Sequence, residues 1–136
     1  MKPHDAIEKL ECFEASKRLL AFKWGENDCC LFAADWVLAL TGADHAESLR
    51  GKYATALAAY RLLGPRGVAG QIEDAATRSG WSEIPPLTAQ RGDVAIVDDG
   101  KGRDCLAVCV NGGFIAPGKN NMVRVPYAKA KRAWRI

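Results

Sequence analysis

The chain has 136 residues, of which 49% are apolar, and this suits one domain with a single buried core. Its formal net charge of +3 is too small to indicate nucleic-acid binding by itself. No apolar run approaches the roughly 18 residues of a membrane span, and the start MKPHDAIEKLE lacks the apolar stretch of a secretory signal. We therefore expect a single domain, residues 1–136, that is made in the cytoplasm and is not secreted by a signal peptide.

The first half of the sequence predicts helices. Apolar residues recur at helical spacing, and glycines or Gly-Pro pairs follow the periodic segments. Helices are expected over residues 3–21, 29–40, 55–63 and 68–79. The second one, CCLFAADWVLAL, is apolar nearly all round and is followed by Gly42, so we place it in the centre of the core. The first helix carries Cys12, which we also expect in the core.

The second half changes to the two-residue period of β-strands. Apolar, β-branched runs alternate with turn sequences, of which DDGKGRD and NGG are the clearest. Short strands are expected in DVAIVDD, CLAVCV, FIA, MVRVP and AWRI. Helices followed by strands predict an α+β domain, in which the second helix packs against an antiparallel sheet.

Two adjacent cysteines lie at the start of the second helix. A helix start carries unpaired NH groups and partial positive charge, which stabilise a thiolate, so Cys29 is a candidate nucleophile. Cys30 points about 100 degrees away around the helix, so one sulfur would face a cleft and the other the core. The alternative is that both are small apolar core residues. Either Asn27 or Asp28 can cap the helix; Asp28 could instead pair with Arg50 or Arg91, but capping is favoured for it.

The chain resembles a known family in several segments. WGENDC at a helix start, RGD before an apolar strand, and a later Gly-rich turn with FI resemble the NlpC-type cysteine peptidases, a papain-like superfamily that cuts cell-wall peptides. More closely, WGENDCCLFAADWVLALTGADHAESLRGKY, RGDVAIV and AWRI resemble a small NlpC-like family encoded in phage and prophage tail modules. The resemblance covers about residues 22–136 and implies a papain-like NlpC-type fold.

The resemblance also implies roles for particular residues. In the peptidases a DC motif supplies the nucleophile, a histidine that opens a strand is the base, and a polar residue on the next strand orients it. These positions fall on Cys29 after Asp28, on Cys105 and near Ala116, so the nucleophile is kept and both partners are absent. A histidine elsewhere could replace the base only if His45, in the loop after the second helix, folded over the nucleophile.

Three more residues are candidates for the lining of the cleft. Trp24 and Gly25 either form its wall or anchor the helix start. Asp93, in RGDV, is either an acid near the cleft or, as we favour, a turn residue at a strand start. No cofactor or metal is expected, because Cys105 and Cys109 would lie about 13 Å apart on a strand, too far for one tetrahedral ion.

A cysteine peptidase needs a neighbour that takes the thiol proton and later protonates the leaving amine. A thiol at Cys105 cannot do this well near pH 7. We therefore expect an inactive NlpC-like domain that serves as a structural or assembly component of a phage-type tail tip. It would be made in the bacterial host cytoplasm and then incorporated into the virion.

The expected partners are larger hub proteins of the tail tip. Residues 111–136 contain six basic side chains and no acid, and this segment could dock on them. Neither a membrane nor a specific nucleic acid is expected as a partner. Two alternatives stay open: an active peptidoglycan peptidase with an atypical base, and a thiol redox or binding module in which Cys29 and Cys105 form a reversible disulfide.

Overall fold

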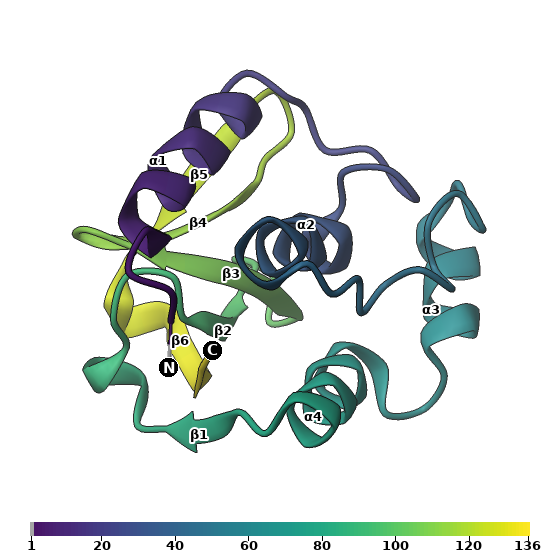
Figure 1. The fold of residues 1–136 in the computed structure, drawn as a ribbon. Helices are drawn as coiled ribbons and strands as arrows, with labels where there is room; N and C mark the ends of the chain where they lie inside the picture. The colour runs from purple at the N-terminus through teal and green to yellow at the C-terminus, as the bar shows by residue number, and fades with distance from the viewer. Residues whose placement is uncertain (1) are drawn as a thin grey trace.

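The computed structural model describes residues 2–136, and its helices precede its strands along the chain (Figure 1). Within this range the helices are α1 (Ala6–Lys17), α2 (Cys29–Thr41), α3 (Ala56–Leu63) and α4 (Gly67–Ser79). The strands are β1 (Ser82–Ile84), β2 (Val94–Asp98), β3 (Asp104–Val110), β4 (Gly113–Pro117), β5 (Met122–Val125) and β6 (Ala130–Arg135). Two short 3-10 turns are η1 (Pro86–Thr88) and η2 (Tyr127–Lys129). The expected α+β class is confirmed. No helix among the described residues is long and apolar enough to cross a membrane.

The six strands form one antiparallel sheet with the order β1-β6-β2-β3-β4-β5. Strands β2 to β5 follow one another as a meander, and β6 returns to lie beside β2. The segment AWRI was expected to close the sheet, and it falls on the end of β6 and the residue after it. Strand β1 was not predicted, because its three residues form no apolar run and only their pairing with β6 defines the strand.

Helix α2 crosses one face of the sheet at the centre of the molecule, where Figure 1 shows it end-on. Its limits follow from local chemistry. Asp28 caps its first turn, and Gly42 ends it in the left-handed conformation with φ 82°. Phe32 and Trp36 are fully buried, and the Trp36 indole donates to the Gly92 carbonyl at 2.8 Å. The prediction of a central core helix is therefore confirmed.

Helix α1 is shorter than predicted and ends at Lys17. The main-chain NH of Phe22 bonds the Gly118 carbonyl at 2.8 Å, so the chain after α1 turns toward the end of β4. Leu20, expected on the apolar face of this helix, is 46% exposed. Cys12 was expected in the core, and this is wrong. It is exposed, because α1 buries only the face that carries Ala6, Leu10 and Phe13.

Side chains alternate between the two faces of the sheet. The face toward the helices carries large residues, among them Ile96, Val108 and Ile115, which pack with α1, α2 and α4. The opposite face carries smaller ones, such as Ala107 and Ala116, and is covered partly by the short η2 turn. There the Tyr127 ring lies 5.4 Å from Phe114 and extends the apolar cluster. Both faces of the central strands are therefore buried.

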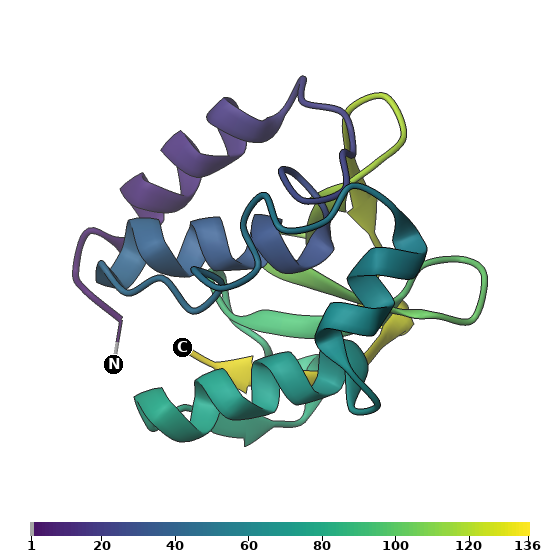
Figure 2. The ribbon, with the colours of Figure 1, turned by 90° about the vertical axis from the view of Figure 1, so that its right-hand side faces the viewer.

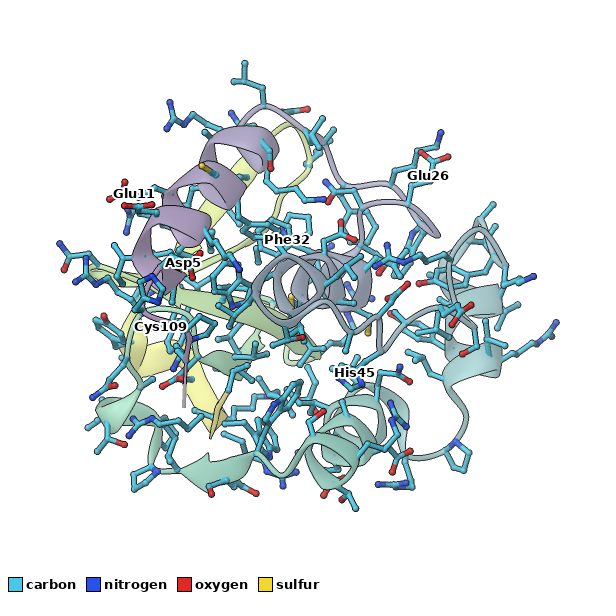
Figure 3. The ribbon with its side chains drawn as sticks, in the orientation of Figure 1. Asp5, Glu11, Glu26, Phe32, His45 and Cys109 are labelled. Carbon is cyan, nitrogen blue, oxygen red and sulfur yellow. The ribbon has the colours of Figure 1, made fainter. Side chains whose placement is uncertain are left out.

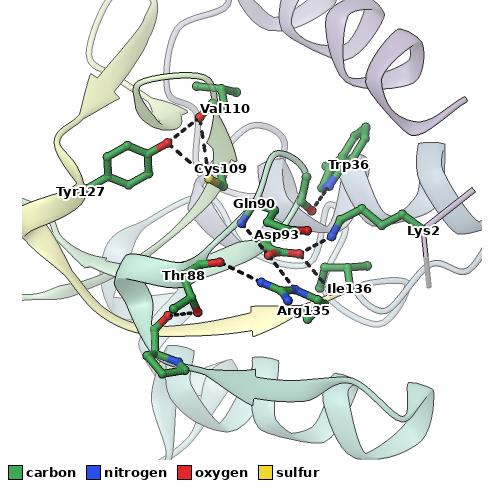
Figure 4. A network of polar contacts seen from close by, with 12 residues as sticks. Lys2, Trp36, Thr88, Gln90, Asp93, Cys109, Val110, Tyr127, Arg135 and Ile136 are labelled. Carbon is green, nitrogen blue, oxygen red and sulfur yellow. Dashed lines mark hydrogen bonds and ion pairs between the residues drawn. The ribbon is translucent and has the colours of Figure 1, made fainter. Parts of the chain in front are cut away.

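A buried carboxylate joins the two ends of the described chain. Asp93 is fully buried in the turn before β2 and forms ion pairs with Lys2 and Arg135 (Figure 4). Its oxygens also accept the main-chain NH groups of Gln90 at 2.8 Å and Ile136 at 3.3 Å. This position is the turn at a strand start that we favoured from the sequence, and its role is structural.

Replacing Asp93 by Asn is expected to lower the free energy of unfolding by about 3 kcal/mol, because the ion pairs lose their acid and an amide group faces backbone donors. The measurement is urea unfolding at neutral pH. Asp104→Asn is the matched control, since Asp104 pairs with Lys131 at the surface and the change should cost less than about 1 kcal/mol. Equal losses in the two variants would contradict the account.

Candidate functional site

The candidate site begins at the capped start of α2. Asp28 is only 2% exposed, yet three donors satisfy its carboxylate. One oxygen accepts the NH of Leu31 at 3.0 Å, and the other accepts the NH of Gly25 at 3.0 Å and the hydroxyl of Tyr53. The expected capping role of Asp28 is confirmed. The carboxylate also connects the loop before α2 with the loop that follows it.

Gly25 supports this connection through its backbone. It has φ 80°, and a side chain there would begin 2.1 Å from the carbonyl oxygen of Tyr53. Its own carbonyl accepts the NH of Gly51 at 2.9 Å. Arg50 does not pair with Asp28. It holds the second loop by binding Asp35 at 2.7 Å and Asp44 at 2.9 Å.

A cleft opens where two neighbouring strands separate. Strand β4 pairs with β3 only from Val108 to Val110, so the first residues of β3 have no partner on that side. The start of α2 lies at this opening, with α3 and the β2–β3 turn beside it (Figure 2). The cleft measures about 960 Å³ and includes Cys29, Cys105 and Gly118 in its lining. The sheet register thus brings a helix start and a strand start together.

Cys29 lies at the floor of this cleft and is half-buried. Hydrogen bonding with the Cys105 side chain is the largest influence that lowers the pKa of Cys29 well below the ordinary thiol value. The side chain of Cys30 and the backbone at Leu106 act in the same direction and outweigh the opposing effect of burial. The surroundings of the Cys29 sulfur therefore favour the thiolate, chiefly through the neighbouring thiols.

The pKa values of the two neighbouring thiols, Cys105 and Cys30, are shifted in the opposite direction, upward. The hydrogen bond to Cys29 and burial both raise the pKa of Cys105 far above the ordinary thiol value. The pKa of Cys30 is raised by the same neighbour and by burial in the core. Deprotonation is therefore favoured at Cys29 and disfavoured at Cys30 and Cys105. Cys30 is buried in the core and Cys29 is more exposed, but both residues contribute to the cleft lining and both pack against the core cluster, so the expected division between core and cleft is only partial.

The other predicted lining residues are only partly at the cleft. Trp24 lines it, with its ring centre 4.7 Å from Phe22. Among the described residues the lining does not include Gly25, Asp93 or Ala116. Gly25 is buried under the second loop, and Asp93 lies at the other end of β2. Ala116 points into the apolar cluster on the sheet face away from α2. Pro117, Gly118 and Lys119, which follow it, line the cleft instead.

No histidine lies among the described residues that line the cleft. His45 lies beside α4 (Figure 3), where its ring is 5.2 Å from that of Trp81 and its Nε2 is 3.1 Å from the Ser79 hydroxyl. Burial lowers the pKa of His45, as does the nearby charge of Arg78. The structure therefore gives the Cys29 thiol no imidazole partner.

The residues around the cleft do not form a metal site. Within residues 2–136 no group of three or more histidine, cysteine or acidic side chains is arranged to hold a metal ion. The cleft does carry charged residues that the sequence reasoning missed, notably Lys101 and Lys119. Lys101 lies in the turn between β2 and β3 and Lys119 in the turn between β4 and β5. No spacing along the sequence predicts that these two turns meet at one cleft.

The comparison with protein families gives one match. A family model described as "Domain of unknown function (DUF6950)" matches residues 1–136. The chain belongs to this family. A search of curated proteins finds no match.

The Asp28 cap can be tested by its removal. Asp28→Ala leaves the main-chain NH groups of Gly25 and Leu31 and the Tyr53 hydroxyl without their acceptor. We therefore expect a loss of about 3 kcal/mol in the free energy of unfolding. Thr55→Ala is the matched control, because Thr55 caps α3 at the surface through one bond of 3.2 Å and should cost about 1 kcal/mol. Urea unfolding of both variants measures the difference. A smaller loss for Asp28→Ala than for Thr55→Ala would refute the role of the network.

Proposed function

We propose that this protein is a structural or assembly component of a phage-type tail tip, built on an NlpC-like, papain-like fold without peptidase activity. The contact between Cys29 and Cys105 carries the proposal. Where the resemblance to the peptidases would put a histidine base, the nucleophile position meets a second thiol.

The arrangement of elements supports the NlpC-like fold. A helix with a cysteine in its first turn packs across an antiparallel sheet, and the strand that begins with the base position lies against that helix. These are the relations that the sequence resemblance implies. The capped start of α2 and the open cleft beside it also agree with descent from an enzyme.

The chemistry of the cleft argues against peptide hydrolysis. Cys105 keeps its proton far above neutral pH, so it cannot accept the proton of Cys29 or deliver one to a leaving amine at the required rate. Ala116, at the orienting position, has no polar side chain. Loss of a catalytic base costs several orders of magnitude in rate even where the rest of the site is kept.

An assembly role is supported by the resemblance to tail-module proteins and by the surface. The C-terminal segment is less basic at its surface than its six basic residues suggest. Three of these cations form ion pairs with acids elsewhere in the chain, namely Lys131, Arg132 and Arg135. Lys119 and Lys129 form no ion pair within residues 2–136. Helix α3 adds exposed apolar side chains, since Leu57 is 59% exposed and Leu62 46%. Exposed large apolar side chains are a common feature of surfaces that bind other proteins.

Tail particles test the assembly role. We expect the wild-type chain to co-sediment, at a fixed ratio to the other tail proteins, with tails purified from cells that express its own tail module. Cys29→Ala should co-sediment equally, because docking does not use the thiol. Quantitative mass spectrometry of gradient fractions measures both. Recovery of the wild-type chain only from the soluble fraction would reject the proposal.

Peptidoglycan digestion distinguishes the enzymatic alternative. In reducing buffer, wild type and Cys29→Ala should release no more soluble fragments from purified peptidoglycan than buffer does, whereas an added lytic enzyme should release them. Release by the wild type that Cys29→Ala lacks would identify an active peptidase with an atypical base.

A further inference from the structure

The cleft floor contains a pair of thiols for which tail assembly provides no use. Cys29 and Cys105 come from different elements and line the same open cleft, and the interaction between their side chains is the largest influence on the pKa of each. The sheet register fixes Cys105 at the beginning of β3, opposite Val97. Two thiols that meet in a cleft can be linked by a disulfide if their backbones are close enough.

We propose that Cys29 and Cys105 form a redox-active dithiol that exchanges with small anionic organic disulfides entering the cleft. Oxidised glutathione is the probe of this class. The inference does not depend on the proposed assembly role, since the exchange needs only the purified chain.

Cys29 is the attacking sulfur. It is the half-buried first residue of α2, where donor groups favour its anionic form. The thiolate attacks one sulfur of the bound disulfide, and the S–S bond of the disulfide breaks. Its other half leaves as a thiolate and takes a proton from solvent. The product is a mixed disulfide on Cys29.

Cys105 is the resolving sulfur. Its pKa is raised chiefly by the neighbouring Cys29 and by burial, and the influence of the Cys29 charge ends once that sulfur is in a mixed disulfide. Cys105 then loses its proton to solvent and attacks the Cys29 sulfur, which expels the second thiolate. One disulfide and the protein dithiol become two small thiols and the Cys29–Cys105 disulfide, so atoms and electrons balance.

This chemistry suits the cleft better than hydrolysis does. A thiolate is a good leaving group at neutral pH, so exchange needs no imidazole to protonate it, whereas the amine of a peptide does. A cleft lining without a histidine therefore disfavours peptide hydrolysis but not thiol–disulfide exchange.

The charges at the rim favour an anionic disulfide. The acids Asp99 and Asp104 are each paired with a cation, Arg103 at 2.9 Å and Lys131 at 2.8 Å. Lys101 and Lys119 also line the cleft, and within residues 2–136 neither has an ion-pair partner. Asp28 also lines the cleft and has no cation partner in the part of the chain that the structure describes, but it is only 2% exposed and three donors satisfy its carboxylate. The unpaired charge exposed at the rim is thus positive, which attracts the carboxylates of a ligand such as oxidised glutathione.

The other cysteines are not arranged for this reaction. Cys12 is exposed on α1 and does not line the cleft. Cys109 shares the apolar cluster of the sheet face away from α2 with Cys105 but does not line the cleft, and its sulfur lies 4.0 Å from the Tyr127 hydroxyl. Cys30 also contributes to the cleft lining, but it is buried in the core and follows Cys29 directly in a helix, a placement unsuited to a disulfide between them.

The test is incubation of the purified chain with oxidised glutathione at neutral pH, followed by intact mass and peptide mapping. Cys12→Ser serves as the background, so that exposed Cys12 does not react. In this background we expect loss of two hydrogens without an adduct, and a bond between Cys29 and Cys105. Adding Cys105→Ala should trap one glutathione on Cys29, and adding Cys29→Ala should abolish both products.

Three results would overturn the proposal: a stable glutathione adduct on Cys29 when Cys105 is present, a bond that joins other cysteines, or no reaction at Cys29. Cys105→Ser is a second trapping variant if Cys105→Ala does not fold. Unfolding curves of each variant show whether a negative result reflects lost structure.

The rim is tested by charge reversal. Lys119→Glu should slow the reaction with oxidised glutathione by about tenfold at low ionic strength and leave the rate with the uncharged bis(2-hydroxyethyl) disulfide unchanged. Lys129→Glu is the matched control, because it makes the same change in net charge away from the cleft lining and should leave both rates unchanged. Equal effects of the two variants would mean that Lys119 does not guide the ligand.

Discussion

The carboxylate of Asp28 is the interaction on which the candidate site depends. It ends the loop before α2, accepts a bond from the first turn of that helix and holds Tyr53 of the following loop. A buried anion is stable there only because all three donors converge on it. Their convergence fixes the start of α2 between the loops before and after it, and with it the direction in which Cys29 points.

The sheet provides the other half of the site. Because β4 leaves β3 after the pair Val108 and Ile115, the beginning of β3 is free to meet the helix start. In a peptidase this meeting would join a thiol to a base. Here it joins two thiols, of which Cys29 is the acidic one and Cys105 keeps its proton. We propose on this basis that the scaffold disfavours hydrolysis of amides and favours exchange between sulfurs, because the two reactions need different leaving groups.

The sequence predicts those features that depend on neighbouring residues. The cap and the glycine stop of α2 are local, and both were found from the sequence. The end of α1 was missed, because it depends on the bond from Phe22 to Gly118 almost a hundred residues away. The bond between Asp28 and Tyr53 has no sequence signal for the same reason. The pairing of Cys29 with Cys105 followed from a family resemblance, since no spacing along the chain encodes the register that brings them together.

The most direct measurement is the pH dependence of Cys29 alkylation by iodoacetamide, followed by peptide mass spectrometry. A lowered pKa keeps the thiolate populated at lower pH, so the rate should reach half its maximum well below pH 8.5, about the midpoint of a free cysteine thiol. Cys105→Ala should move that midpoint upward, because Cys105 is the largest influence on it. A midpoint at or above that of the free thiol, or one that the variant leaves unchanged, would contradict the account.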